Sequence, residues 1–217
     1  SFELFPPKTD RGMANLSETI QQLCRYKPEY ISVTYGAGGG NVGANRQVCR
    51  MVRNAGTVPV THFTVIRNTK QGIREQLETY LKEGVDHILA LRGDFPRGET
   101  STGGDFNYAT DLVKFIRDEF GEQFEIAVAG SPEGHISCRS LEADIAVLKQ
   151  KQDNGADYIM TQLCWDMEQF ERWLDKIRKA GVTLPVDVGI MPILDQAATI
   201  NMALSRNGCV MDRELSR

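Results

Sequence analysis

The most constraining feature of the sequence is a repeated alternation between short apolar runs and longer segments of helical period. Seven runs rich in β-branched and aromatic residues have the length and composition of strands. They lie at 1–5, 30–35, 58–66, 87–91, 124–129, 157–163 and 186–191. Each is followed by a segment whose apolar residues recur every three or four positions. Seven such units in series predict parallel strands joined by right-handed helical crossovers.

End signals place several of the helices between these runs. The second helix is predicted at 44–54, and the third begins at a capping Asn68 or Thr69 and stops at Gly84. The last helix is predicted to begin at about Gln196. These boundaries leave a loop after each strand, a long one rich in Gly, Thr and Pro after the fourth, and parallel α/β proteins hold their functional side chains in such loops.

Two folds satisfy the pattern, a closed barrel and an open, doubly wound sheet. No GxGxxG follows the first strand, which weakens a dinucleotide-binding sheet. Polar and acidic residues instead follow several different strand ends, as in the sites of barrels. They are Thr34, His62, Asp94, Ser131 and Gln162. We therefore expect a (β/α)8 TIM barrel, with 1–217 as a single catalytic domain. No eighth unit can be recognised, so the C-terminal unit is expected to be missing or incomplete.

Composition excludes several classes of partner. The formal net charge of −4 and the pI of about 5.5 argue against a nucleic-acid partner, which requires a basic face. No apolar stretch of about 18 residues is present, so no membrane span is predicted. The five cysteines form no CxxC pair, which favours reduced thiols in a cytoplasmic protein. The three histidines lack metal-ligand spacing, and no metal is expected.

Glu3 is the first candidate catalytic residue, because it lies inside an otherwise apolar strand. Between Phe2 and Phe5, its carboxylate is expected to be poorly solvated. Such a group keeps its proton near neutral pH, as a general acid must. The alternative is a structural glutamate tied to a neighbouring backbone group or an arginine.

Three further positions carry both a functional and a structural interpretation. Asp94 follows Gly93 at the end of the fourth strand, where it is either a catalytic group or a turn aspartate. His62 is either a core histidine or a ligand contact. Asp144 and Lys151 lie two helical turns apart on one face, which is typical of a solvated surface pair as well as of a binding site.

Several segments, in order along nearly the whole chain, together carry a family resemblance. They are Ser1-Phe2-Glu3-Leu4-Phe5-Pro6-Pro7, Ser32-Val33-Thr34-Tyr35-Gly36-Ala37, Leu91-Arg92-Gly93-Asp94, Asn107-Tyr108-Ala109-Thr110-Asp111-Leu112, Pro132-Glu133 with His135, Ala143-Asp144, Lys149 with Lys151, Gly155-Ala156-Asp157 and Thr161-Gln162. With these segments the chain resembles the methylenetetrahydrofolate reductases of bacterial type.

The resemblance implies a (β/α)8 barrel with FAD bound non-covalently at the carboxyl ends of the strands. It implies reduction of 5,10-methylenetetrahydrofolate to 5-methyltetrahydrofolate by hydride transfer, in a ping-pong cycle. Glu3 would be the general acid. Asp94 would hydrogen-bond the pterin and stabilise a cationic intermediate, and Gln162 would contact pterin and nicotinamide in turn. For the cofactor, the family's contacts fall on Tyr35, Ala37, His62, Arg92, Gly93, Asp94, Tyr108, Ala109, His135, Asp144 and Lys151, with Thr34 on the nicotinamide side.

Three departures from the family pattern leave the electron donor open. Gln150 and Val147 stand where some members have arginine and asparagine near the FAD phosphates. Ser131 occupies a cofactor position where many members have a tyrosine. Met202 stands where an aromatic residue can stack on folate or nicotinamide. The donor is therefore NADH, NADPH or a ferredoxin-type carrier. A homo-oligomer or a redox partner subunit is expected.

Two alternatives belong to other classes. One is an unrelated barrel lyase or isomerase acting on a phosphorylated metabolite. The segment after the seventh strand, Gly189-Ile190-Met191-Pro192, lacks a glycine-rich phosphate turn, which counts against it. The other is a non-catalytic subunit of a redox complex. The joint presence of Glu3, Asp94 and Gln162 argues against that alternative.

Overall fold

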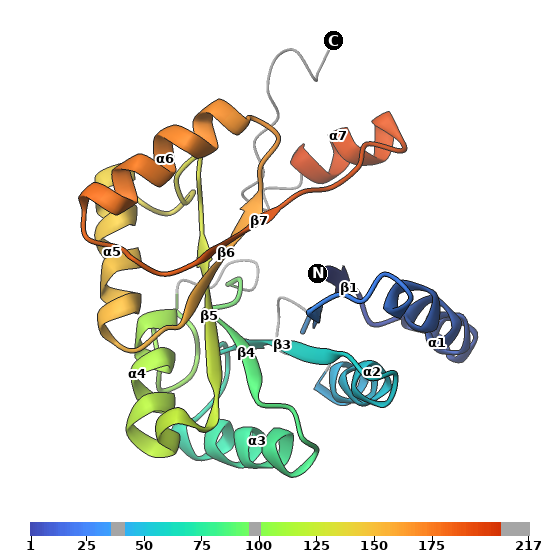
Figure 1. Ribbon diagram of the computed structural model, residues 1–217. Coiled ribbons are helices and arrows are strands. Elements are labelled where there is room, and N and C mark those ends of the chain that lie inside the picture. The colour runs from blue at the N-terminus through green and yellow to red at the C-terminus, as the bar shows by residue number, and fades with distance from the viewer. Residues whose placement is uncertain (36–41, 96–100, 205–217) are drawn as a thin grey trace. The chain divides into compact units, whose positions relative to one another are not determined.

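The structure is a computed structural model that describes residues 1–35, 42–95 and 101–204 (Figure 1). The chain divides into two compact units, Ser1–Ile126 and Ala127–Arg217. In both units, strands and helices alternate along the sequence. No helix within the described ranges has the length and apolar character needed to cross a membrane.

The first unit contains four parallel strands that pair in chain order. They are β1 (Phe2–Leu4), β2 (Tyr30–Val33), β3 (Val58–Thr64) and β4 (His87–Leu91). The helices between and after them are α1 (Asp10–Cys24), α2 (Val42–Asn54), α3 (Lys70–Lys82) and α4 (Ala109–Phe120), with a short 3-10 turn η1 (Gly121–Gln123) after α4. Every strand is thus joined to its neighbour by a helical crossover, as the alternation predicts.

The two faces of this sheet have different roles. Thr61 and Phe63 point to the helices: Thr61 donates a hydrogen bond to Asn45 of α2, and the Phe63 ring lies 6.2 Å from that of Tyr80 on α3. Because side chains alternate along a strand, His62 and Thr64 point the other way. We call that opposite side, which also carries Glu3, the inner face.

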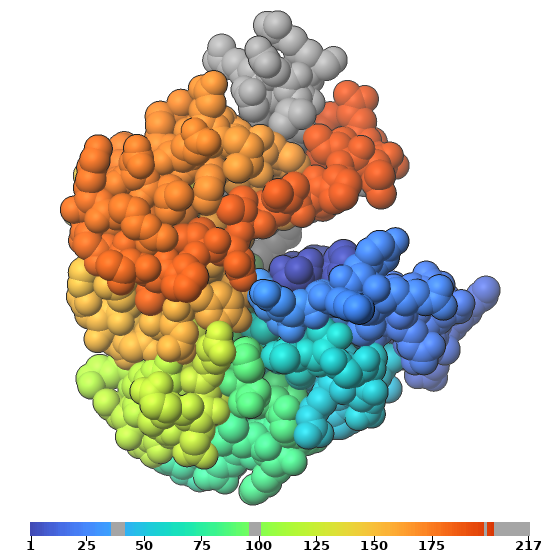
Figure 2. All heavy atoms as spheres, in the orientation of Figure 1, coloured from blue at the N-terminus to red at the C-terminus, as the bar shows by residue number. Residues whose placement is uncertain are grey.

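The second unit contains a parallel sheet of three strands, of which the first begins in the first unit. They are β5 (Glu125–Gly130), β6 (Tyr158–Leu163) and β7 (Val186–Gly189), followed in turn by α5 (Leu141–Asp153), α6 (Met167–Lys179) and α7 (Gln196–Leu204). Figures 1 and 2 show α5 and α6 side by side. Trp173 and Ile177 of α6 are almost fully buried, which makes α6 the main apolar cover of these strands.

The seven predicted strands are all confirmed, but β1, β2, β3 and β7 end earlier than the apolar runs indicate. Pro6 and Pro7 have no N–H to donate to a ladder, so β1 stops before them. The carbonyls of Val33 and Thr34, at the end of β2, accept hydrogen bonds from the Asn45 side chain. Runs of apolar residues do not reveal such side-chain competitors.

Helix boundaries follow their caps closely. Thr69, rather than Asn68, caps α3, because its hydroxyl accepts a hydrogen bond from the N–H of Gly72 at 3.1 Å. Gly84 ends the helix in a left-handed conformation with φ +72°. The all-parallel order within each unit is that of a (β/α)8 barrel, and the described residues hold seven of its eight strands. The expected incompleteness of the barrel is thereby confirmed for these residues.

Candidate functional site

The inner face of the first unit brings together two predicted site residues, Glu3 and His62. Glu3 Oε2 lies 3.4 Å from His62 Nε2, with side-chain exposures of 48% and 12%. The partner of Glu3 is therefore a histidine and not the arginine or backbone group of the structural alternative. Phe2 and Phe5 are themselves 37% and 71% exposed and do not shield the carboxylate. The expectation that Glu3 is poorly solvated is wrong for the described residues, because its aromatic neighbours do not cover it.

Two buried polar atoms on β3 stand out beside this pair. His62 Nε2 and Thr64 Oγ1 are buried and have no hydrogen bond within residues 1–35, 42–95 and 101–204. Glu3 approaches His62 Nε2 to 3.4 Å without forming a hydrogen bond with it. Buried polar groups normally have partners, so two such atoms on one face indicate a surface built to contact a polar ligand. Thr64 was missed in the sequence, although its place two residues after His62 predicts the same face.

The end of β4 forms a sharp turn. Gly93 has φ +86°, a left-handed conformation that other residues rarely adopt, and Asp94 after it is exposed. The guanidinium of Arg92 lies 4.5 Å from the centre of the Phe95 ring, and its Nε donates to Gly93 O. The cation–π contact holds the positive charge beside the turn that presents Asp94.

At the end of β2, Tyr35 points away from the inner face. Its hydroxyl donates to Gln76 Oε1 of α3 at 2.6 Å, and its ring lies 5.6 Å from that of Phe63. Burial raises the pKa of Tyr35 to about 12. A cofactor contact at Tyr35 would therefore have to use its main chain. Thr34 is half-buried and its N–H donates to Leu4 O of β1, while Ala37 lies outside the described residues.

The start of α4 presents an aromatic ring. The N–H groups of Asn107 and Tyr108 both donate to Asp111 Oδ2, at 3.1 and 3.0 Å. This capping interaction fixes the first turn that begins with Ala109. The Tyr108 side chain stays 62% exposed, so its ring is accessible for stacking on a planar ligand.

In the second unit, Asp144 and Lys151 are not a solvated surface pair. Asp144 Oδ2 accepts from the backbone N–H of His135 at 3.1 Å and holds the loop after β5. Lys151 Nζ donates to Ala129 O of β5 at 2.9 Å. Desolvation lowers the pKa of the Lys151 ammonium, and attraction to Asp144 and to Cys138 opposes the shift. A poorly solvated cation held at the end of a strand is suited to receive an anion.

Gln162 lies where the pairing between β6 and β7 is irregular. The register shifts between Met160 and Leu163, and Gln162 Oε1 accepts from the N–H of Leu163. A bulge of this kind redirects a side chain next to a site. Gly189 permits the close approach, because a Cβ there would lie 2.8 Å from Thr161 O.

The second unit contains three further residues that bear on the site. Ser131 is half-buried directly after β5, whereas the side chain of Met202 lies outside the described residues. Glu133 was noted in the sequence only as part of the resemblance. Desolvation raises its pKa, and the Cys164 thiol beside it, whose pKa burial raises to about 12, is its hydrogen-bond partner. Its place shortly after a strand end was the signal that could have found it.

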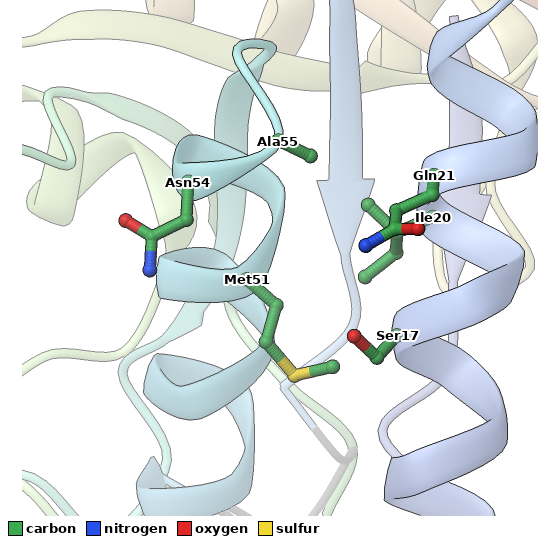
Figure 3. Close-up of a pocket in the computed structure, with 6 residues that line it drawn as sticks. All are labelled: Ser17, Ile20, Gln21, Met51, Asn54 and Ala55. Carbon is green, nitrogen blue, oxygen red and sulfur yellow. The ribbon is translucent and has the colours of Figure 1, made fainter.

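Two surface pockets lie elsewhere. One, of about 190 Å³, lies between α1 and α2 and is lined by Ser17, Ile20, Gln21, Met51, Asn54 and Ala55 (Figure 3). The other, of about 230 Å³, is lined by Val42, Arg46, Gly72, Glu75, Gln76 and Thr79. Neither includes a predicted site residue. No set of three or more His, Cys, Asp or Glu side chains in the described ranges could hold a metal ion.

Parallel strands in chain order, with polar side chains where the strands end, define an α/β protein of the (β/α)8-barrel class. Within that class the chain belongs to the methylenetetrahydrofolate reductase family, whose model matches residues 1–208. It is 37% identical over 216 residues to methylenetetrahydrofolate reductase (NADH) 1 of Arabidopsis thaliana, covering 94% of this chain and 36% of that protein. It is 36% identical over 194 residues to 5,10-methylenetetrahydrofolate reductase of Escherichia coli (strain K12), covering 89% and 64%.

The chain thus spans about a third of the plant relative and somewhat less than two thirds of the bacterial one. Among solved structures it is similar to an uncharacterized protein from Clostridium thermocellum that binds two copies of 5-methyl-5,6,7,8-tetrahydrofolic acid. The TM-score is 0.67 at 13% identity, with 98% of this chain and 72% of that chain covered. At this identity the likeness shows the fold.

Proposed function

We propose that residues 1–217 form the catalytic barrel of a flavin-dependent enzyme that reduces 5,10-methylenetetrahydrofolate to 5-methyltetrahydrofolate. The observation that carries the proposal is the inner face of the first unit. There Glu3 lies beside a histidine, and two buried polar atoms on β3 have no hydrogen bond among the described residues. Membership of the family supplies the substrate class. The names of the plant and bacterial relatives agree with it.

The residues present fit FAD as the cofactor. His62 Nε2 and Thr64 Oγ1 have hydrogen-bonding capacity to offer, and Tyr108 presents an exposed ring. Lys151, with support from Arg92, would bind the phosphates, since one ammonium does not neutralise a pyrophosphate. Gly93, Ala109, Ser131, His135 and Asp144 complete the proposed contacts. When bound, FAD supplies the hydride that the folate receives.

Glu3 is the proposed general acid. Its carboxyl proton moves to a folate nitrogen, the C–N bond of the five-membered ring breaks, and the methylene carbon becomes an electrophilic iminium. Because Glu3 is 48% exposed, the bound ligands themselves must exclude water from it. His62 lies 3.4 Å from Glu3 on the same face, so the acid and a cofactor contact are neighbours before the folate arrives.

Asp94 and Gln162 are the proposed substrate contacts. A carboxylate at Asp94 would hydrogen-bond the pterin and stabilise the positive charge that develops on ring opening. Gln162 would contact the pterin and a nicotinamide in alternate half-reactions, with Met202 beside them. The donor is NAD(P)H or a ferredoxin-type carrier, delivered by a partner subunit in the second case. NADH in the name of the plant relative supports the first.

The test separates the two half-reactions. The purified protein should bind FAD and be yellow. Its flavin should be reduced anaerobically by NADH, NADPH or reduced ferredoxin, and methylenetetrahydrofolate should reoxidise it. Glu3→Gln removes the proton donor, so reoxidation should stop while reduction continues at nearly the wild-type rate. Normal reoxidation by Glu3→Gln would overturn the assignment of the acid. A colourless protein that takes up no flavin would overturn the function.

A further inference from the structure

Asn45, in the first turn of α2, is a buried polar side chain with hydrogen bonds to two strands and two helices. It is fully buried between the helices and the sheet. Its Nδ2 donates to the carbonyls of Val33 and Thr34, at 3.0 and 3.1 Å. Its Oδ1 accepts from the hydroxyls of Thr61 and Tyr80, at 2.9 and 2.6 Å, and more weakly from the Cys49 thiol at 3.6 Å.

This arrangement uses the whole hydrogen-bonding capacity of one amide. A side-chain amide has two N–H donors and one oxygen with two lone pairs. Both donors go to the end of β2, and both strong acceptor positions are filled by hydroxyls from β3 and α3. An aspartate of the same shape would keep the acceptor. It would also place a second oxygen against two carbonyl oxygens, which is repulsive.

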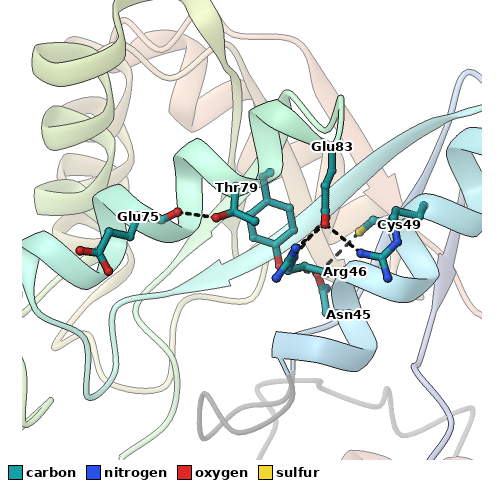
Figure 4. A network of polar contacts seen from close by, with 8 residues as sticks. Asn45, Arg46, Cys49, Glu75, Thr79 and Glu83 are labelled. Carbon is teal, nitrogen blue, oxygen red and sulfur yellow. Dashed lines mark hydrogen bonds and ion pairs between the residues drawn. The ribbon is translucent and has the colours of Figure 1, made fainter.

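The helix that carries Asn45 is itself held in place. The next residue, Arg46, and then Arg50 one turn later, both form ion pairs with Glu83 at the end of α3. Figure 4 shows Arg46 beside Glu83. The guanidinium of Arg46, and then that of Arg50, lower the pKa of the Glu83 carboxyl. Because these ion pairs join α2 to α3, the Asn45 amide supports the end of β2 from outside the sheet.

The supported strand end leads directly to a proposed site residue. Thr34 is bonded on both sides: its N–H donates to Leu4 O of β1, and its carbonyl accepts from Asn45. Tyr35 after it is held through its hydroxyl by Gln76. Thr34 is the residue expected on the nicotinamide side of the site. We propose that Asn45 is a positioning residue that fixes Thr34 for reduction of the flavin. This inference rests on the proposed function.

The test compares two substitutions of Asn45 with a control substitution at one of its hydrogen-bond partners. Asn45→Asp disturbs the contacts with Val33 and Thr34, and Asn45→Ala removes them without adding charge. Tyr80→Phe is the matched control, because it removes one donor to Oδ1 and leaves the strand end bonded. Each protein is assayed with saturating donor for flavin reduction and, separately, for reoxidation by methylenetetrahydrofolate. Flavin content and thermal midpoint are recorded for each, so that rates refer to folded, flavin-loaded protein.

A misplaced contact of this kind costs about tenfold to hundredfold in the step that uses it. We expect that loss in flavin reduction by Asn45→Asp or Asn45→Ala, with reoxidation changed less than about threefold. Tyr80→Phe should lower the thermal midpoint and leave both rates within about twofold of wild type. Equal loss in both half-reactions, or a Tyr80→Phe protein with the same kinetic defect, would show that Asn45 acts only on stability. If Asn45→Asp does not fold, Asn45→Ala alone decides. A wild-type protein whose flavin is not reduced would overturn the proposed function and this inference with it, whereas a reducible wild type with unchanged Asn45 variants would overturn this inference alone.

Discussion

At the residue scale, β3 offers an internal comparison between two threonines on opposite faces of one strand. Thr61 points to the helices and donates its hydroxyl to Asn45 at 2.9 Å. Thr64 points to the inner face, and its hydroxyl is buried without a hydrogen bond in the described part of the chain. The same side chain is therefore hydrogen-bonded by the fold at one position and, among the described residues, has no hydrogen bond at the other.

Replacement of each threonine by valine should have opposite effects on stability. A buried polar group without a partner costs about 1–3 kcal/mol. Thr64→Val should therefore leave the ligand-free protein as stable as wild type or raise its free energy of unfolding by about 1 kcal/mol. It should also weaken FAD binding severalfold. Thr61→Val should lower the free energy of unfolding by about 1 kcal/mol and leave FAD affinity unchanged. Urea titration and flavin fluorescence measure the two quantities. An unchanged FAD affinity in Thr64→Val would remove Thr64 from the site.

At the element scale, α2 and α3 are joined by a charge cluster. Glu83 accepts hydrogen bonds from both Arg46 and Arg50, and its side chain is only 18% exposed. The pKa of Glu83 is lowered, first by its hydrogen bond with Arg46. A carboxyl with a lowered pKa in the folded state stabilises the protein above its unfolded pKa. That contribution is lost as pH falls through the folded value.

Glu83→Gln should therefore lower stability in a pH-dependent way. At pH 7 we expect a loss of about 1 kcal/mol, because these side chains are partly exposed and screened. Once the pH falls below the lowered pKa of Glu83, the wild-type carboxylate is protonated as well, and the two proteins should become equally stable. Urea titrations from pH 7 down into this acid range test the prediction. Glu78→Gln, whose carboxylate lies 3.9 Å from Lys82 on an exposed face of α3, is the control and should have almost no effect. A pH-independent loss in Glu83→Gln would mean that packing, not charge, is responsible.

The positions of the helices and strands were also the features that the sequence predicted best. Period and caps located every strand and identified Thr69 as one of two candidate caps, because those signals are local. The ends of the strands depend on distant partners, such as the Asn45 amide at the end of β2, and these could not be read from the apolar runs. The same limit applies to the site. The structure brings Glu3 and His62 together, which the sequence did not predict, and the outward orientation of Tyr35 and the desolvation of Lys151 likewise depend on packing by other elements.

At the scale of the whole molecule, the groups that stabilise the fold differ from the groups proposed to bind the ligand. The fold is held by buried apolar side chains and by fully bonded polar groups such as Asn45. The polar atoms proposed to meet FAD are the poorly satisfied ones, Thr64 Oγ1 and His62 Nε2, together with the desolvated ammonium of Lys151. Such groups cost stability in the ligand-free protein and recover it on binding, so ligand and stability are linked.

The linkage between ligand binding and stability can be tested most directly at Lys151. Its pKa is lowered in the folded state, chiefly by desolvation. Between that lowered value and the unfolded pKa of about 10.4, the unfolded chain binds the extra proton, so this lysine makes stability rise with pH. Lys151→Met should remove that rise and raise the thermal midpoint of the ligand-free protein by about 2–4 °C at pH 7, for a gain of about 1 kcal/mol. It should also weaken FAD binding about tenfold or more, because a charged hydrogen bond to phosphate is lost.

Lys149→Met is the matched control for this change. Lys149 lies on the same helix, but its ammonium pairs with Asp153 one turn further on, where both side chains are at least 34% exposed. Loss of this surface pair should change neither the FAD affinity nor the pH dependence of stability appreciably. Thermal melts across pH 6–10 and flavin titrations of both variants distinguish the positions. If Lys151→Met destabilised the ligand-free protein and bound FAD normally, Lys151 would be a structural cation that serves the carbonyl of Ala129, and the phosphates would have to be held elsewhere.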